Sequence, residues 1–340
     1  MPSSSKTSVE ASDVTLDRIH DPDFEAEVHR LVALDVARLQ ERREEFVERA
    51  CPACHSDRLH PAFTFQGFDY KRCGDCGLLF ISPGPTNEHT LWFLEVSEGL
   101  RLWRESMPQA VRQRRKPMYV ERAQYLADLI EKYGVTPDSL LEIGAGNGEL
   151  AEALLEIMPN LSRVFLYEPQ PLSFQHPKVE ICESLEGLDA HGGGVDLVAC
   201  FEVIEHIPDP DDLLDSVHTA LSSDGLFVLS TPNERGFEMQ VLKTLSTSLP
   251  FDHVCLYSPE ALTRLLQRKG FEVVEITTPG KLDLEMVVRE YQAGRLDLSD
   301  NPAVQFLAEA RDDIQSAFQS FLAQSGQSSH MRVVARKRGS

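Results

Sequence analysis

Short apolar runs rich in β-branched residues alternate with amphipathic helical patterns over the second half of the chain. Strands that alternate with helices pack into a mostly parallel sheet with helices on both faces. The pattern therefore predicts an α/β fold with a doubly wound, seven-stranded sheet. Its strands are expected at 140–143, 163–167, 179–182, 195–201, 226–230, 272–277 and 331–335, and its main helices at 119–133, 150–158, 211–221 and 259–269.

The first half of the chain has a different pattern. A polar lead ends at Asp21-Pro22, which predicts a helix N-cap followed by proline in the first turn, and the helix is expected to run from about Asp23 to Arg49. The apolar connector after residue 82 needs burial, so it is expected to pack over the α/β domain. We predict a disordered lead (1–20), an N-terminal helix (21–50), a metal-binding module (51–82), a connector or lid (83–116), and an α/β domain (117–338) with a helical insertion (284–322).

The first predicted strand of the sheet leads into a glycine-rich turn. Gly144, Gly146 and Gly148 alternate directly before a helical pattern, and the acid Glu142 stands inside the strand end. Glycine allows a ligand to approach the backbone closely. A dinucleotide fingerprint would need G-x-G-x-x-G, with its third glycine where Glu149 stands. This arrangement favours a cationic or zwitterionic ligand over a pyrophosphate.

The second strand supplies a further acid. Glu168 ends it, twenty residues after Gly148, where a carboxylate can accept hydrogen bonds from both hydroxyls of a ribose. Cys182 to Leu185 follow the third strand. Together these features resemble the class I S-adenosylmethionine (SAM) methyltransferases, which are Rossmann-like, over about residues 117–278.

That resemblance implies a set of cofactor-binding residues. It places Glu142 and Gly144 near the methionine moiety and Ser184 and Leu185 beside the adenine. Methyl transfer is an in-line displacement from an already activated sulfonium, so the protein mainly supplies alignment and, where needed, a base. The full expected set is Glu142, Gly144, Ala145, Gly146, Gly148, Glu168, Pro169, Ser184, Leu185, Phe201 and Glu202.

Acids and histidines follow the fourth strand and stand again before the helix at 259–269. If the chain turns helically after the fourth strand, Glu202 faces Glu205 and His206. Asp252 and His253 add a second acid and a second histidine. We expect His206, His253, Glu205 and Asp252 to be the catalytic residues.

Three interpretations of these residues remain open. In the first, His206 or His253 is a general base. The strings FEVIEHIPDP and DHVCLYSPE resemble sugar C-methyltransferases, which also carry an N-terminal four-cysteine zinc module. The chain differs from that family in having Pro250 or Phe251 where a catalytic tyrosine is expected. In the second, Glu202, Glu205, His206 and His253 bind a divalent cation, because E-x-x-E-H and STPN resemble small-RNA 2′-O-methyltransferases and ubiquinone-pathway O-methyltransferases. In the third, an acid–histidine pair only orders the loop over SAM.

Two C-x-x-C pairs predict a structural metal site. Eighteen residues separate the pair Cys51 and Cys54 from the pair Cys73 and Cys76, a spacing typical of a four-thiolate zinc site. Cysteines in a reducing compartment bind zinc more readily than they form disulfides. We therefore expect Zn²⁺ at these four residues, and a scaffolding module that touches no substrate is an equal alternative to one that does.

Composition and charge indicate which classes of partner the protein can bind. The net charge of −21 opposes general binding to nucleic acid, while the basic stretch from Arg101 to Arg122 is either a phosphate cradle or a solvated helix face. No apolar stretch spans a bilayer. The sequence predicts a cytoplasmic SAM-dependent methyltransferase for a small-molecule acceptor, a sugar, a nucleotide-linked sugar or a natural-product intermediate. The alternative is a divalent-metal-assisted O-methyltransferase that uses the E-x-x-E-H site to methylate an RNA 2′-hydroxyl or a catechol-like acceptor.

Overall fold

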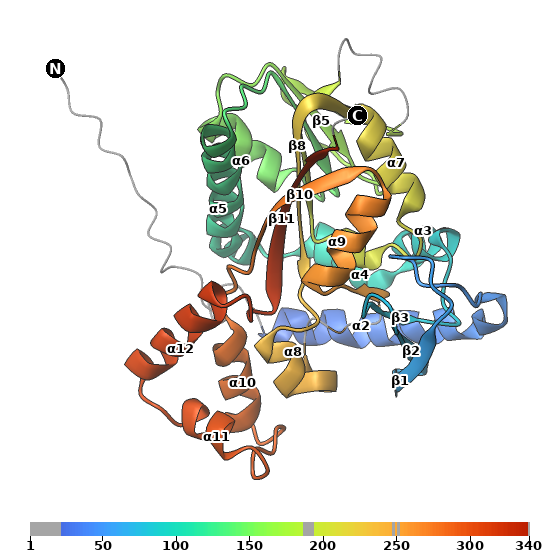
Figure 1. The fold of residues 1–340 in the computed structure, drawn as a ribbon, viewed down its shortest axis with the longest axis vertical. Helices are drawn as coiled ribbons and strands as arrows, with labels where there is room; N and C mark the ends of the chain where they lie inside the picture. The colour runs from blue at the N-terminus through green and yellow to red at the C-terminus, as the bar shows by residue number, and fades with distance from the viewer. Residues whose placement is uncertain (1–21, 186–193, 247–248, 250–251, 339–340) are drawn as a thin grey trace.

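The computed structural model describes residues 22–185, 194–246, 249 and 252–338 (Figure 1). The expected disordered lead, the Asp21 cap and the positions of Pro250 and Phe251 lie outside this part. None of the described helices is long and apolar enough to cross a membrane.

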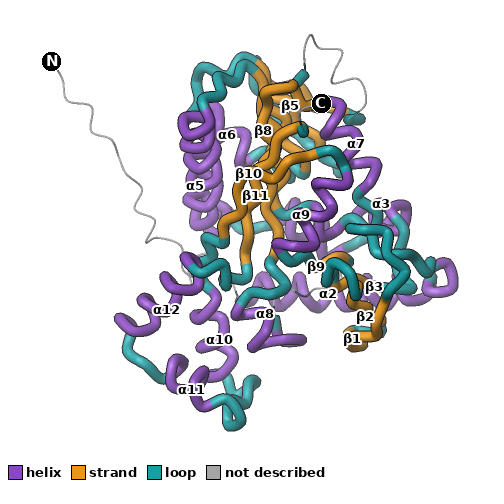
Figure 2. Tube along the Cα trace, in the orientation of Figure 1, coloured by secondary structure: helices purple, strands orange, loops and turns teal. Residues whose placement is uncertain are grey.

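A seven-stranded sheet forms the centre of the molecule, as Figure 2 shows, and confirms the predicted α/β fold. Its spatial order is β10-β11-β8-β7-β4-β5-β6, and only β11 runs antiparallel to its neighbours. The carboxyl ends of β4, β5, β7 and β8 therefore meet at one edge. The strands are β4 (Ser139–Ile143), β5 (Arg163–Tyr167), β6 (Val179–Cys182), β7 (Val195–Phe201), β8 (Leu221–Pro232), β10 (Phe271–Thr277) and β11 (His330–Lys337).

Alternating residues of the strands supply two cores. Leu140 faces helices α5 and α6, whereas its neighbour Leu141 belongs to the core on the opposite face. Helices α7 and α9 cover that opposite face (Figure 1). These helices are α5 (Gln109–Tyr133), α6 (Glu149–Ile157), α7 (Asp211–Ala220) and α9 (Pro259–Arg268).

Two elements begin earlier than expected. Helix α5 starts at Gln109 rather than Tyr119, because Pro117 is accommodated inside it instead of marking its start. Strand β8 starts at Leu221 rather than Leu226, because the polar run from Ser222 to Gly225 hides its first half in the sequence pattern.

The helical insertion forms three separate helices beside α8 (Phe237–Leu242) and the short 3₁₀ helix η5 (Lys243–Leu245). The three helices project from one end of the sheet in Figure 1. The first two share a small apolar core with α8, and Phe318 of the third packs against Phe237 of α8. They are α10 (Asp283–Gln292), α11 (Pro302–Ala308) and α12 (Asp312–Gln324).

The N-terminal part is more regular than the sequence pattern indicated. Helix α2 ends at Glu41 and not near Arg49. The 3₁₀ helix that follows, η2 (Arg43–Glu45), is charged and has no buried residue, so packing does not continue the helix there. The expected connector is mostly helical. The elements are α2 (Pro22–Glu41), β1 (Leu59–Phe65), β2 (Phe68–Cys73), β3 (Leu79–Ile81), α3 (Asn87–Val96) and α4 (Glu98–Ser106).

A second, four-stranded sheet joins the two halves of the chain. Its order is β1-β2-β3-β9, and β9 (Cys255–Leu256) comes from the α/β domain. Aromatic side chains of this sheet, including Phe68, Tyr70 and Phe80, belong to the same buried core as α7 and α9. The four-cysteine module (residues 51–82) is therefore packed against the α/β domain.

Candidate active site

The glycine turn after β4 needs glycine for two independent reasons. Gly144 and Gly148 have φ angles of +77° and +87°, a region that residues with a Cβ rarely adopt. A Cβ on Gly148 would also lie 2.5 Å from a ring carbon of Phe174. The turn therefore exposes bare backbone at the carboxyl edge of the sheet, immediately before α6.

Glu168 is held at the tip of β5 by backbone hydrogen bonds. The Gly146 N–H donates to its Oε2 at 3.0 Å, and the Gln170 N–H donates to its Oε1 at 3.1 Å. A carboxylate has about four lone-pair positions, so each oxygen keeps acceptor capacity for a ligand. The expected ribose acceptor is thus preoriented next to the glycine turn.

Glu142 is a buried acid at the end of β4, only 5% exposed. Burial raises its pKa to about 8, although the charge of Arg122 acts in the opposite direction. Its Oε2 has no hydrogen-bond partner among the described residues. Arg122 lies with its guanidinium over the ring of Phe201, 5.3 Å from the ring centroid. The carboxyl group of Glu142 and the guanidinium of Arg122 therefore lie beside the same strand ends.

One cavity of about 510 Å³ lies at this edge of the sheet and contains residues from both expected halves of the site. The cofactor-binding residues expected from the sequence that line it are Gly144, Glu168, Pro169, Ser184, Leu185 and Glu202. Of the expected catalytic residues, His206 and Asp252 line it. Glu142, Ala145, Gly146, Gly148, Phe201, Glu205 and His253 are not among its lining residues.

His206 is oriented by the segment that carries Asp252. It ends a short 3₁₀ helix, η4 (Ile204–His206), and its Nδ1 lies 3.0 Å from the backbone oxygen of Asp252 and 3.5 Å from a carboxylate oxygen of the same residue. A carbonyl oxygen only accepts, so Nδ1 carries the proton and Nε2 keeps its lone pair. The ring of His253 packs against that of His206 with centroids 4.6 Å apart.

The two acids after β7 have different surroundings. Glu205 is fully buried, and burial together with the charge of Glu202 raises its pKa well above the usual value. Thr231 donates a hydrogen bond to Glu205 Oε2 at 3.0 Å, while Oε1 has no partner among the described residues.

Glu202 does not join the helical turn. Its φ angle is +56°, and its carboxylate accepts a hydrogen bond from Ser230 and lies 3.5 Å from Nε2 of His330. Burial raises the pKa of Glu202, but the charges of His330 and Arg122 and the Ser230 hydrogen bond outweigh it, so the pKa lies below its usual value.

One cluster at the acceptor side has metal-ligand geometry. Single ligand atoms of Glu205, His206 and His253 all lie within 4.8 Å of one another. Glu202, which the expected E-x-x-E-H site would include, is not part of this cluster.

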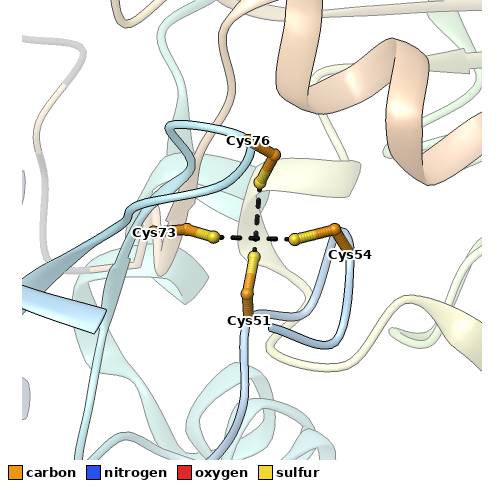
Figure 3. A group of neighbouring side chains, drawn as sticks. All are labelled: Cys51, Cys54, Cys73 and Cys76. Carbon is orange, nitrogen blue, oxygen red and sulfur yellow. Dashed lines mark hydrogen bonds between the residues drawn. The ribbon is translucent and has the colours of Figure 1, made fainter. Parts of the chain in front are cut away.

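The four cysteines converge on one point (Figure 3). Their Sγ atoms lie within 4.8 Å of one another, and the Cys51–Cys76 and Cys54–Cys73 pairs are each 3.5 Å apart. A tetrahedral Zn–S₄ site with bonds of about 2.3 Å places its sulfurs roughly 3.8 Å apart. All four thiols are free, and the Asp75 N–H points to Cys73 Sγ at 3.4 Å. The donor set therefore fits zinc.

Sequence reasoning did not select Arg122 or His330 as site residues. In the sequence Arg122 only ends a basic stretch, whereas in the structure its guanidinium lies over the ring of Phe201. His330 lies at the start of β11, and because this strand is antiparallel, its first residue reaches the same edge as the ends of β7 and β8. The nine cavity residues from α2, α3, α4 and their connections were also missed; they are Leu39, Pro85, Asn87, His89, Thr90, Leu91, Phe93, Leu94 and Leu100.

Comparison with known proteins gives the family of the central domain. Residues 115–276 match the family model described as a methyltransferase domain. A ubiquinone biosynthesis O-methyltransferase of Psychrobacter arcticus is 28% identical over 166 residues, 44% of this chain and 57% of that protein. The corresponding protein of Psychrobacter cryohalolentis is 26% identical over 174 residues, 46% of this chain and 60% of that protein. The chain thus spans less than two thirds of the length of these relatives.

A solved structure of the plantazolicin methyltransferase BpumL in complex with SAH covers 74% of this chain and 94% of its own, with 13% identity and a TM-score of 0.45. The matched segment 115–276 contains the glycine turn, Glu168 and His206. Residues 115–276 are therefore an S-adenosylmethionine-dependent methyltransferase domain.

Proposed function

We propose that the protein transfers the methyl group of SAM to a hydroxyl of a small-molecule acceptor. The observation that carries this proposal is the single cavity that Gly144 and Glu168 line together with His206 and Asp252. Methyl transfer requires the donor and the acceptor in one water-poor space with the reacting atoms in line, and alignment of this kind lowers barriers by about 7–11 kcal/mol in intramolecular models.

The charges around the glycine turn support a zwitterionic cofactor. Glu168 accepts from the ribose hydroxyls, and Ser184 and Leu185 flank the adenine. Glu142 faces the ammonium group of the methionine moiety, while the guanidinium of Arg122 pairs with the carboxylate of the same moiety. This assignment gives the unpartnered Oε2 of Glu142 a hydrogen-bond donor. It also explains why a carboxyl group and a guanidinium lie together beside the strand ends.

The acceptor hydroxyl needs a proton acceptor as the new bond forms. Bound SAM supplies an electrophilic methyl group on a sulfonium. His206 holds its Nδ1 proton toward the Asp252 carbonyl, so its Nε2 is free to take the hydroxyl proton. Oxygen gains the methyl group, the sulfonium leaves as the neutral thioether, and the proton stays on His206 until it exchanges with solvent.

The cavity wall supports an acceptor with an apolar body and no phosphate. Its lining contains no lysine or arginine among the described residues, but five carboxylates: Glu168, Glu202, Asp209, Asp212 and Asp252. A diphosphate in this cavity would be repelled. The nucleotide-linked acceptor expected from the sequence would have to place its phosphates elsewhere, toward the arginines of α4 and α5.

A second candidate function is metal-assisted O-methylation. The convergence of Glu205, His206 and His253, together with the buried and unpartnered Oε1 of Glu205, supports it. A divalent cation there would lower the pKa of an acceptor hydroxyl and would keep Glu205 ionised. The names of the relatives from the two Psychrobacter species agree with O-methylation.

We infer that the four cysteines bind a structural zinc ion, that the chain divides at about residues 51, 83 and 117, and that the protein works in the cytoplasm, where thiols stay reduced. Free thiols at all seven cysteines support the last point.

Calorimetry and turnover measurements test the proposal. We expect SAH to bind the wild type, Glu168→Ala to lose most of that affinity, and His206→Gln to keep it but to lose turnover with neutral hydroxyl-bearing acceptors. If SAH does not bind the wild type, the proposal fails. A turnover that requires added Mg²⁺ while the zinc content stays constant would favour the second candidate, whereas a metal-independent rate that is lost in the variant His206→Gln would favour the base.

A further inference from the structure

The four-cysteine module reaches the cavity only through other segments. Among the described residues, none from 51–82 lines the cavity. The module instead pairs its strand β3 with β9, in the register Leu79↔Leu256 and Phe80↔Cys255. The Ile81 N–H adds a hydrogen bond of 3.0 Å to the oxygen of Val254. Val254 and Asp252 do line the cavity, so the edge of the module fixes the backbone of one cavity wall.

A single guanidinium forms a second link. Arg268, the last residue of α9, donates from Nε to the oxygen of Ala53 at 3.0 Å and from Nη2 to the oxygen of Pro52 at 2.9 Å. Its Nη1 donates to a carboxylate oxygen of Asp211 at 2.8 Å. Only the planar fork of arginine can hold two backbone carbonyls and one carboxylate in this way.

One end of this link lies in the Cys51–Cys54 loop, and the other lies at the start of α7 beside the cavity. Pro52 and Ala53 lie between Cys51 and Cys54, so the direction of their carbonyls depends on the closure of that loop around its ligand atoms. Asp211 begins helix α7, and Asp212, Leu213 and Ser216 of its first turns line the cavity. The hydrogen bonds from Arg268 lower the pKa of Asp211, so the pair is charge-assisted.

We propose that Arg268 is a positioning residue that couples the metal-bound state of the four-cysteine module to two walls of the cavity, the start of α7 and the segment Asp252–Val254. Without metal, the four thiols have no common ligand and the Cys51–Cys54 loop opens. Arg268 then loses two of its acceptors, and β3 loses its support beside β9. The inference rests on the proposed zinc site and extends the proposed function, because it makes the metal a determinant of the shape of the acceptor side.

Hydrogen exchange tests this coupling. We would compare the full-length zinc-loaded protein with the same protein after zinc removal by a chelator, and measure amide protection in the peptides covering 208–220 and 252–258. Metal content and SAH affinity are measured on the same samples. We expect zinc removal to raise exchange in both peptides by about tenfold or more, as the loss of charge-assisted hydrogen bonds implies, with little change in the peptides covering β4 and β5.

Substitutions separate Arg268 from the metal. Arg268→Ala should keep the zinc ion and SAH affinity but raise exchange in the 208–220 peptide. Arg268→Lys should behave similarly, because an ammonium cannot span all three acceptors. Arg264→Ala is the matched control, since Arg264 lies on the same helix and, among the described residues, forms an ion pair only with Glu260 at the surface.

Several outcomes overturn the inference. It fails if zinc removal leaves both peptides protected, if Arg268→Ala and Arg264→Ala give equal exchange, or if the purified protein holds no metal. The last result would leave the methyltransferase proposal intact. Conversely, a protein that binds no SAH but loses protection on zinc removal would refute the proposed function and support the coupling.

Discussion

The protonation of Glu142 provides a quantitative test of the cofactor site. This carboxyl is buried in the empty protein with a pKa of about 8. If it receives the ammonium of SAM or SAH, it must be ionised in the complex. Below its pKa, ionisation costs about 1.4 kcal/mol for each pH unit, so binding is penalised by roughly 1.4 kcal/mol at pH 7 and about 2.7 kcal/mol at pH 6. The affinity for SAH should therefore rise about tenfold per pH unit from pH 6 to pH 8, then level off.

Isothermal titration calorimetry of SAH binding measures this effect directly. At pH 7, binding should release close to one proton, detected by repeating the titration in buffers of different ionisation enthalpy. Glu142→Gln removes the titrating group and keeps the shape, so its affinity should be independent of pH and should differ most from that of the wild type at pH 8. A flat wild-type profile, or a slope that persists in Glu142→Gln, would refute the assignment of Glu142 to the ammonium.

The stability of the protein without SAH provides an independent test, and it should decrease with pH where the affinity for SAH increases. A carboxyl whose pKa is raised on folding destabilises the folded state as pH increases from the unfolded pKa of about 4.5 toward the folded value of about 8. At pH 7 the cost is roughly 3 kcal/mol. Glu142→Gln should therefore raise the melting temperature of the empty protein at pH 7 to 8 and leave it nearly unchanged at pH 4.5. A uniform shift at every pH would indicate a packing effect instead.

Three further predictions concern other parts of the site. Cys73→Ser should reduce the zinc content to zero and lower the free energy of unfolding by several kcal/mol, as metal analysis and calorimetry would show; retained zinc would contradict the four-thiolate site. His206→Gln should lower kcat by about 10²–10⁴-fold with SAH affinity unchanged, and an equal loss of SAH affinity would point to loop ordering instead. Gly148→Ala should weaken SAH binding and destabilise the protein by about 1–2 kcal/mol from backbone strain alone, with the Phe174 contact adding to it, and unchanged thermal unfolding would contradict the required left-handed turn.

The features that the sequence predicted well are those encoded by neighbouring residues. The glycine turn, the acid at the end of β5 and the two C-x-x-C pairs each depend on a few positions, and each lies in the structure where its spacing implied. The order of strands and helices in the α/β domain followed from alternating periodicity for the same reason. The end of α2 was misplaced because helix propensity continues in the charged segment after Glu41, whereas the packing that supports the helix does not.

The features that could not be predicted depend on contacts between distant segments. Arg268 is separated from Ala53 by more than two hundred residues, and no local pattern distinguishes it from Arg264 four residues earlier. His330 could be placed beside Glu202 only if the last strand was known to be antiparallel. Strand direction follows from how β11 inserts between β8 and β10, which is a property of the whole sheet and not of the residues 330–337.

The cavity lining is divided between the methyltransferase domain and the segments that precede it. Nine of the 27 residues that line the cavity, from Leu39 to Leu100, precede residue 115, where the match to the methyltransferase family begins. Most of these nine are apolar. The residues proposed to bind SAM therefore lie within the matched domain, while much of the wall that would select an acceptor lies outside it. An acceptor screen should accordingly be guided by the apolar, acid-rich cavity of this chain, and substitutions in α3, such as Leu94→Arg, should change acceptor selectivity without altering SAH affinity.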